Sequence, residues 1–300
     1  MAALPGFFFF VFGTAIGSFL NVVILRYRPE RPLFDLKIIS GRSRCPKCGK
    51  LIPARELIPL ASFLFLRGKC SACRERISIQ YPLVEFLTGL VFLGVPLFLN
   101  RFYGQSNELF FSFAMDPWYY FLVAFWVLAF VCFILLVAID LRHYIIPDEL
   151  NVMVGTVGIF VAWLLAQNQA LLAPFSTSFV RHYALVFSPV SNLLLGHLLG
   201  AVAAGLFFLA LVLLTKGRGM GMGDVKFMFM AGLLFGWPDV AVATFFAFLL
   251  GGVTAGVLFF LRKKGMKDKI PFGPFLVLGL SAAFFFGYPA LQGYFALFNI

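Results

Sequence analysis

The chain has 300 residues, of which 61% are hydrophobic and 12% are charged. A soluble domain contains roughly 45–50% apolar residues, so this composition excludes a water-soluble globular protein and indicates a membrane protein. The net charge of +11 would suggest nucleic acid as a partner in a soluble chain. In a membrane protein the positions of the basic residues report topology first.

Eight apolar runs follow one another along the chain, and a membrane-spanning helix needs about 20 apolar residues. The runs are Pro5–Leu25, Pro82–Leu99, Trp118–Ile139, Leu150–Ala166, Asn192–Leu214, Val225–Gly236, Asp239–Leu261 and Phe272–Phe298. The sixth run is too short to cross a bilayer alone. We expect a tilted or broken helix there, which is tolerated where it lines a protein cavity. The pattern predicts an all-α polytopic membrane protein with about eight transmembrane helices.

The basic residues sort to one side of this predicted topology. The segment from Arg26 to Gln80 contains 13 of the 24 Lys and Arg residues, whereas only Arg101 and Arg181 fall on the opposite side. Cytoplasmic loops of membrane proteins are enriched in Lys and Arg. We therefore expect the basic loops in the cytoplasm and both termini outside, which explains the net charge without nucleic acid.

The first run is predicted to be a retained helix, because no basic stretch precedes it and no small-residue cleavage site follows it. Gly13 and Gly17 form a small-xxx-small pair, which allows close helix packing in lipid. Ser18 and Asn21 follow on the cytoplasmic end of the same helix. The spacing leaves open whether these residues only join helices or also have a functional role.

Two C-x-x-C pairs lie in the polar segment after the first run, Cys45 with Cys48 and Cys70 with Cys73. Their separation is close to that of a zinc ribbon, in which two turns each present two thiolates to one tetrahedral ion. The expected reducing cytoplasm disfavours the alternative, a disulfide pair. The pattern predicts a closed, structural zinc site that supplies much of the folding energy of this small segment.

Glu85, Asp140 and Asp148 are among the acidic residues that lie where a predicted span begins or ends. Glu85 is expected in the first turn of the second span, where an acid complements the helix dipole. Asp148 follows a proline and is expected to be the N-cap of the fourth span. Asp140 ends the third span, where a carboxylate opposes the helix dipole. Helix stability therefore explains Glu85 and Asp148 but not Asp140.

The stretch from Gly219 to Lys226 places three alternating glycines before Asp224, at the start of the sixth run. Glycine allows positive φ or the close approach of another chain, and an acid at the membrane edge is costly and by default functional. An N-cap role for Asp224 is the structural alternative. We expect Gly223→Val to block the reaction in which Asp224 takes part, while leaving the fold and the zinc site in place.

Asp140 and Asp224 are both expected at the cytoplasmic edge of the membrane. Two carboxylates that meet in a poorly solvated site share a proton, so that one can activate water while the other polarises a carbonyl. The N-terminus of the sixth helix would favour ionised Asp224, and the C-terminus of the third would favour protonated Asp140. The pair predicts aspartic-protease chemistry, with Asp224 as the base and Asp140 as the acid.

Four blocks of the sequence resemble the type IV prepilin peptidases, the GxGD class of intramembrane aspartyl proteases. The blocks are Gly17-Ser-Phe-Leu-Asn-Val-Val; the double C-x-x-C loop with Ile58-Pro and Tyr81-Pro-x-Val-Glu85; Asp140 with Ile146-Pro-Asp148; and Gly221-Met-Gly-Asp224-Val-Lys226 with Ile270-Pro-Phe-Gly-Pro274. The loop departs from the family where Glu56-Leu57 replaces its usual Asn before Ile-Pro.

The resemblance implies a bacterial inner-membrane enzyme that cleaves the basic leader of prepilins or pseudopilins after glycine, at the cytoplasmic face. It implies that Asp140 and Asp224 are catalytic, with Gly221, Gly223 and Lys226 in the loop that the substrate approaches. It also implies N-methylation of the new N-terminus with S-adenosylmethionine. Gly68 and Lys69 match positions that the family ties to this methyl transfer.

The resemblance divides the chain into a first transmembrane helix over residues 1–25, a zinc-ribbon-like cytoplasmic loop over 26–81, and a transmembrane peptidase core over 82–300. The expected partners are prepilin or pseudopilin substrates and the lipid bilayer, with the oligomeric state left open. A proton- or ion-coupled transporter that uses the two aspartates as a relay is the main alternative. A scaffold that recruits pilus components through the zinc module is a third.

Overall fold

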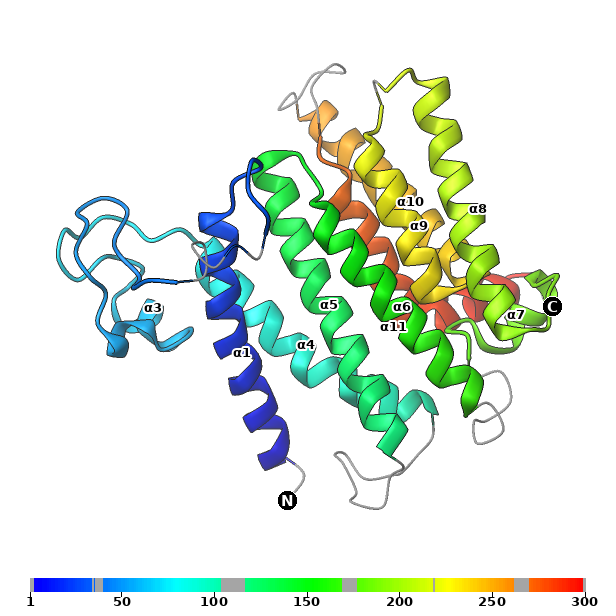
Figure 1. The fold of residues 1–300 in the computed structure, drawn as a ribbon, viewed down its shortest axis with the longest axis horizontal. Coiled ribbons are helices and arrows are strands. Elements are labelled where there is room, and N and C mark those ends of the chain that lie inside the picture. Colours follow the sequence, from blue (N-terminus) through cyan, green and yellow to red (C-terminus); the bar gives the residue numbers. More distant parts are fainter. Residues whose placement is uncertain are drawn as a thin grey trace. The chain divides into compact units, whose positions relative to one another are not determined.

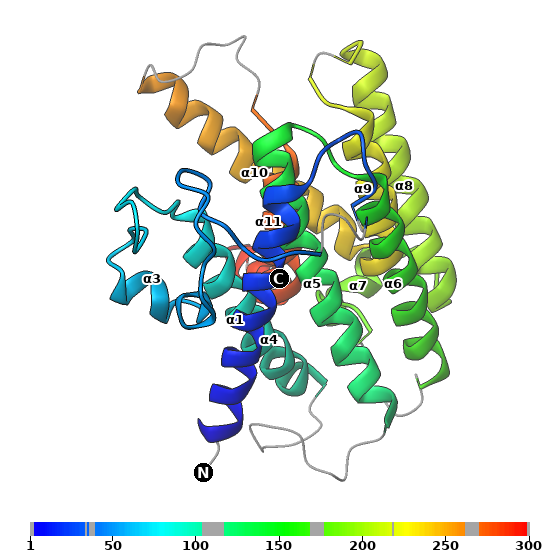
Figure 2. The same ribbon diagram turned by 60° about the vertical axis from the view of Figure 1, so that its left-hand side comes forward.

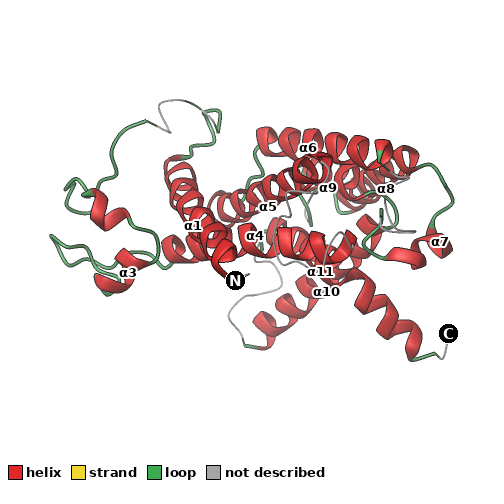
Figure 3. Cartoon of the chain, turned by 90° about the horizontal axis from the view of Figure 1, so that it is seen from below, coloured by secondary structure: helices red, strands yellow, loops and turns green. Residues whose placement is uncertain are grey.

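A computed structural model of the chain describes residues 3–33, 35, 40–103, 117–168, 177–217, 219–261 and 270–298. Within these ranges the long elements are all α-helices and no strand is present (Figure 3). The basic residues Lys37 and Arg218 and those between 262 and 269 lie outside the described ranges. The all-helical architecture predicted from the apolar runs is confirmed.

The helices fall into two compact units, residues 1–138 and 139–300. The first contains α1 (Ala3–Arg26), α3 (Ala61–Phe65), α4 (Gln80–Tyr103) and most of α5 (Pro117–His143). The second contains the end of α5, α6 (Asp148–Gln167), α7 (Ala184–Phe187), α8 (Leu193–Leu214), α9 (Met222–Phe235), α10 (Asp239–Phe260) and α11 (Gly273–Ala296) (Figure 1).

Seven of the described helices are long and apolar enough to cross a membrane, and α9 is the long helix that is not. Its 14 residues extend about 21 Å at 1.5 Å per residue, whereas the hydrocarbon core of a bilayer is about 30 Å thick. The expectation that the sixth apolar run is too short to span alone is therefore confirmed.

In the first unit, α1 packs against α4 through glycines (Figure 2). A Cβ atom on Gly13 would lie 2.9 Å from Gly89 Cα, and one on Gly17 would lie 2.7 Å from Glu85 Cα. Larger residues at these positions would push the helices apart. The predicted close packing is confirmed. Glu85, however, is in the second turn of α4, because this helix begins at Gln80, so the predicted first-turn role is wrong.

In the second unit, α9 lies between α6 and α8 (Figure 1). Glycines make both contacts close: a Cβ atom on Gly158 would lie 2.7 Å from Leu234 N, and one on Gly232 would lie 2.5 Å from Gly200 O. Small residues let helix backbones approach in a membrane, where packing rather than the hydrophobic effect drives association. The short helix is therefore held by its neighbours on two sides.

The turn after α9 is covered by the segment between α6 and α8. Asp239, at the start of α10 and 1% exposed, accepts hydrogen bonds from the Ser178 hydroxyl at 2.9 Å and from the Phe179 and Val180 N–H groups at 3.2 Å. The Trp237 indole N–H donates to the Phe187 carbonyl at 2.8 Å. These contacts bring the 178–187 segment to the end of α9.

Candidate active site

Asp140 lies in the last turn of α5, at the start of the second unit, and is 5% exposed. Its Oδ2 atom accepts the backbone N–H of Gly273, the first residue of α11, at 3.0 Å. The N-terminus of a helix carries a partial positive charge and favours a nearby anion. The sequence placed Asp140 only at the C-terminus of its own helix, so it missed the second helix end that faces this carboxylate.

Asp224 is the third residue of α9 and is 8% exposed. Its Oδ2 atom accepts the N–H of Gly221, the N-cap residue, at 3.1 Å. The N-cap alternative is thus wrong in position, although Asp224 does satisfy a free N–H at the helix start, as third-position acids do. The charges of Asp224 and Asp140 also interact directly. Both carboxylates are buried, and each accepts a backbone N–H from the start of a helix.

The loop after α5 joins the two aspartates through Ile146 and Gly223. A Cβ atom on Gly223 would lie 3.3 Å from Ile146 Cβ, closer than most such contacts. Gly221 has φ of −90°, and Gly223 lies within the helix α9, so neither is in the left-handed region. Glycine at 223 is therefore needed for close approach rather than for positive φ, and the group that approaches it in this structure is Ile146.

Lys226 forms an ion pair with Asp148, with Nζ 2.9 Å from both carboxylate oxygens. Both side chains are more than half exposed, and exposed pairs of this kind contribute only about 0–1 kcal/mol. Asp148 is the first residue of α6 and Pro147 is the N-cap, so the predicted N-cap role of Asp148 is wrong. The pair joins the start of α6 to α9, and a substrate role for Lys226 stays a prediction.

Two further residues of the second unit carried no predicted role. Gly273 belongs to the Ile270–Pro274 block, where a proline in the second helical position marks a helix start, and this signal could have identified the N–H that binds Asp140. Asn151 is 2% exposed, and neither its Oδ1 nor its Nδ2 atom has a hydrogen-bond partner. No sequence signal distinguishes Asn151 from an ordinary helix residue.

The four cysteines of the first unit come together as predicted. Their Sγ atoms all lie within 4.8 Å of one another, and Cys45 Sγ is 3.9 Å from Cys73 Sγ. Four thiolates at 2.3 Å from one Zn²⁺ would lie about 3.8 Å apart, and none of the four forms a disulfide. The donor set therefore fits a tetrahedral zinc ion, and Cys45, Cys48, Cys70 and Cys73 would hold it.

Backbone donors prepare the first turn for a metal. The N–H groups of Cys48 and Lys47 donate to the Cys45 sulfur and lower the pKa of this thiol to about 6. A thiolate rather than a thiol is the metal ligand. Cys45 is therefore disposed to ionise near neutral pH.

The two cysteine turns have the same backbone pattern. The Cys45 N–H donates to Lys50 O, and the Cys70 N–H donates to Glu75 O. The residue after each second cysteine is left-handed, with φ of +70° at Gly49 and +59° at Arg74. The structure thus repeats one metal-binding turn twice, which the spacing alone did not specify.

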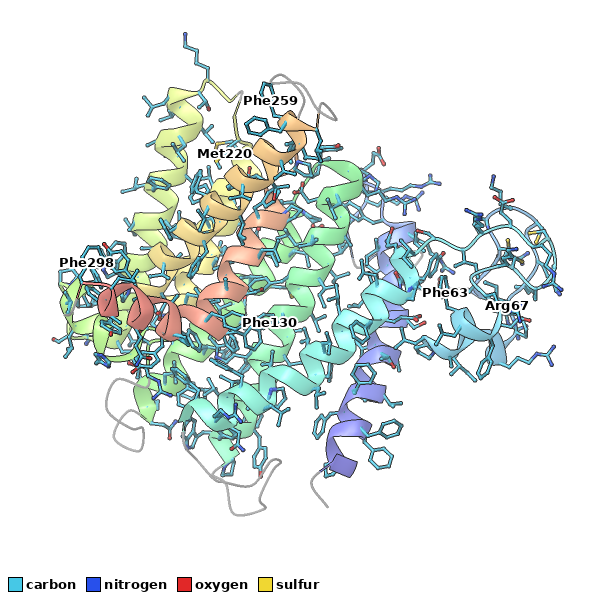
Figure 4. All side chains as sticks on the ribbon, turned by 180° about the vertical axis from the view of Figure 1, so that it is seen from behind. Phe63, Arg67, Phe130, Met220, Phe259 and Phe298 are labelled. Atoms are coloured by element: carbon cyan, nitrogen blue, oxygen red, sulfur yellow. The ribbon has the colours of Figure 1, made fainter. Side chains whose placement is uncertain are left out.

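Gly68 and Lys69 lie just before the second cysteine turn. Gly68 has φ of +66°, which favours glycine, and its N–H donates to Phe63 O at 2.8 Å. Residues 40–79, which contain the four cysteines, form a lobe of the first unit, and Figure 4 labels Phe63 of α3 and Arg67 in this lobe. The turn explains the glycine by itself, and a methyl-transfer role for Gly68 and Lys69 stays a prediction.

Comparison with known proteins gives consistent similarities over both units. Residues 11–99 match a family model described as the bacterial peptidase A24 N-terminal domain, and residues 126–256 match the type IV leader peptidase family. The chain is 31% identical over 279 residues to the prepilin leader peptidase/N-methyltransferase of Bacillus subtilis (strain 168), covering 93% of each chain.

Two further relatives bear the same printed name. The protein of Aeromonas hydrophila is 31% identical over 299 residues, covering 92% of this chain and 89% of the relative. That of Legionella pneumophila is 29% identical over 311 residues, covering 97% and 95%. No solved structure matches the chain.

Proposed function

This chain belongs to the type IV leader peptidase family, and from that premise we propose that it removes the leader of prepilins or pseudopilins and N-methylates the new N-terminus. The observation that carries the peptidase half is the buried pair Asp140 and Asp224, whose charges interact within one unit. The relatives' shared name, prepilin leader peptidase/N-methyltransferase, supports both halves.

In the proposed cleavage, the two carboxylates share one proton, because two negative charges in a poorly solvated site cannot both form cheaply. The ionised carboxylate takes a proton from water, and the protonated one donates a hydrogen bond to the scissile carbonyl. Each carboxylate accepts a backbone N–H at a helix start, from Gly273 or Gly221. The helix dipoles therefore do not decide which carboxylate is the acid and which is the base. We withdraw the fixed assignment of Asp224 as the base and treat the two carboxylates as one titrating unit.

We place this site at the cytoplasmic face of the bacterial inner membrane. The basic segment from Arg26 to Gln80 and the positive-inside rule support that orientation. Seven of the described helices are candidate spans, and α9 is shorter than a bilayer. In this proposal α9 is counted as an eighth crossing, and an even number of crossings places both termini outside. A prepilin with a basic leader and an apolar helix would present its scissile bond at the same membrane edge.

The methyl-transfer half is proposed for the lobe that bears the cysteines. Zinc bound there would hold the two cysteine turns together, which is a structural role. S-adenosylmethionine is the proposed methyl donor, and its sulfonium would supply an electrophilic methyl group. The domain division into residues 1–25, 26–81 and 82–300 is retained as part of this proposal.

The test is incubation of the purified protein with a prepilin in detergent, followed by mass spectrometry of the pilin N-terminus. We expect leader loss and a mass increase from one methyl group, and no leader loss with Asp140→Asn or Asp224→Asn. An ion-coupled transporter or a scaffold would leave the prepilin intact with the wild-type protein, and that result would refute the proposal.

A further inference from the structure

Two of the four sequence blocks are not used by the aspartate pair, and parts of both meet around Glu85 in the first unit. Ser18 and Asn21 lie on α1, Leu60 lies just after the Ile58-Pro block of the lobe, and Tyr81 lies with Glu85 on α4. Glu85 is 7% exposed. A buried carboxylate at a membrane edge is costly, and helix stability no longer explains this one, since it is outside the first turn.

The groups around Glu85 offer mainly hydrogen-bond acceptors. Glu85 Oε2 accepts the Leu60 N–H at 2.8 Å, and the Ser18 side chain also bonds to this carboxylate. Asn21 is 2% exposed and donates through Nδ2 to Tyr81 O at 3.0 Å, while its Oδ1 has no partner. An unmade buried acceptor costs about 1–3 kcal/mol. Among the described residues of the cluster, a hydrogen-bond donor for Asn21 Oδ1 is therefore missing.

The donor that Glu85 does have comes from a strained backbone. Leu60 has φ of +58° and ψ of −50°, and the Ala61 N–H donates to Pro59 O across it. This is a γ-turn of the rare, strained kind, and such conformations cost about 1–3 kcal/mol and occur at functional sites. The strained turn thus holds the Leu60 N–H against the Glu85 carboxylate. A ligand with a stronger hydrogen-bond donor could take the place of this N–H and release the turn.

We propose that Glu85, Asn21 and Ser18 bind the N-terminal amine that leader cleavage releases, and hold it for methylation. This inference rests on the proposed methyltransferase function and assigns it an acceptor site. An α-amine carries several N–H donors and a positive charge when protonated. It therefore matches the Glu85 carboxylate together with the unpartnered oxygen of Asn21, whose side chain bonds to Tyr81 O one helical turn before Glu85. In this account the amine takes the place of the Leu60 N–H on Glu85.

The cluster also supplies the proton acceptor that methylation needs. The amine nitrogen uses its lone pair to form a C–N bond with the methyl group of a sulfonium donor. The C–S bond breaks, and its electron pair stays on sulfur as a neutral thioether. The nitrogen must lose a proton, and Glu85 takes it. Asn21 Oδ1 and the Ser18 hydroxyl oxygen orient the amine by accepting its other N–H groups.

The test uses mature, unmethylated pilin as the acceptor with S-adenosylmethionine, so that cleavage is not required. Glu85→Gln keeps an oxygen for the Leu60 N–H but removes the charge and the proton acceptor. We expect methyl transfer to fall about tenfold or more, as for the loss of a charge-assisted hydrogen bond. Prepilin cleavage, bound zinc and thermal unfolding should stay unchanged. The matched control is Glu30→Gln, at an exposed acid after α1, which should methylate normally.

A double variant that moves the carboxylate from position 85 to position 21 separates binding of the amine from a purely structural role of Glu85. Asn21→Asp combined with Glu85→Gln moves the carboxylate across the cluster, and we expect it to recover part of the lost methyl transfer. Normal methylation by Glu85→Gln, or no recovery in the double variant, would overturn the amine site while leaving the proposed function intact. A wild-type protein that cleaves but never methylates would refute both.

Discussion

Gly223 gives the sharpest prediction, because two different reasons for a glycine can be separated there. A Cβ atom at this position would lie 3.3 Å from Ile146 Cβ and 3.7 Å from its Cγ1. Valine adds two further methyl groups against Ile146, which is 8% exposed and has little room to move. Overpacking of this kind costs about 1–3 kcal/mol, so Gly223→Val should lower the thermal unfolding temperature as well as cleavage. The expectation that the fold would be unaffected is therefore revised.

The partner variant is Ile146→Ala, which opens the space that valine needs. On its own it should destabilise the protein by about 2–4 kcal/mol, as large-to-small changes in packed sites do. In the double variant we expect the two losses to be less than additive by about 1 kcal/mol or more, since contacting residues couple in this range. Thermal unfolding in detergent of the wild type, both single variants and the double variant measures this coupling.

Cleavage of a prepilin by the same four proteins then separates the two reasons for the glycine. If only Ile146 requires it, the double variant should cleave much faster than Gly223→Val alone. If the substrate also passes close to Gly223, cleavage should stay low although stability recovers. Strictly additive unfolding losses would contradict the contact between Gly223 and Ile146 from which this reasoning begins.

Three further predictions concern the ion pair, the metal site and the helix contact. Lys226→Ala should lower stability by less than about 1 kcal/mol, because its pair with Asp148 is exposed; a large loss of prepilin cleavage at unchanged unfolding temperature would instead indicate a substrate role. Zinc affinity should fall as the pH falls, because protons compete with the metal for the four thiolates; metal content after dialysis at a series of pH values measures this, and a zinc content that does not fall with pH would contradict it. Gly13→Leu should separate α1 from α4, because its Cβ would lie 2.7 Å from Phe92 Cβ; unchanged thermal unfolding would show that the contact is unimportant.

The sequence predicted the helices and the metal ligands well because both depend on local patterns. Apolar runs mark the spans, and the spacing of the cysteine pairs is enough to identify two metal-binding turns. The shortness of α9 was also visible in its run. The segment that covers the end of α9 was not visible, because Asp239 and residues 178–187 meet only in the folded chain.

The environment of the aspartates was the part that sequence reasoning could not supply. Asp140 was assigned from its own helix end, whereas the donor it binds, the Gly273 N–H, lies 133 residues further along. Glu85 was explained by a helix start at Pro82, whereas α4 begins two residues earlier, at Gln80, and Glu85 lies five residues after that start. In both cases a contact distant in sequence overrides the local electrostatic argument.

The central claim is that Asp140 and Asp224 act as one catalytic unit. It is tested most directly by the single-turnover rate of prepilin cleavage for Asp140→Asn, Asp224→Asn and the double variant, with Asn151→Ala as a control at another buried polar residue of the second unit. Groups that act as a unit lose nearly all activity with the first substitution, so we predict that the double variant cleaves no more slowly than either single variant. Single variants with near wild-type rates, or partial losses that multiply in the double variant, would contradict the claim.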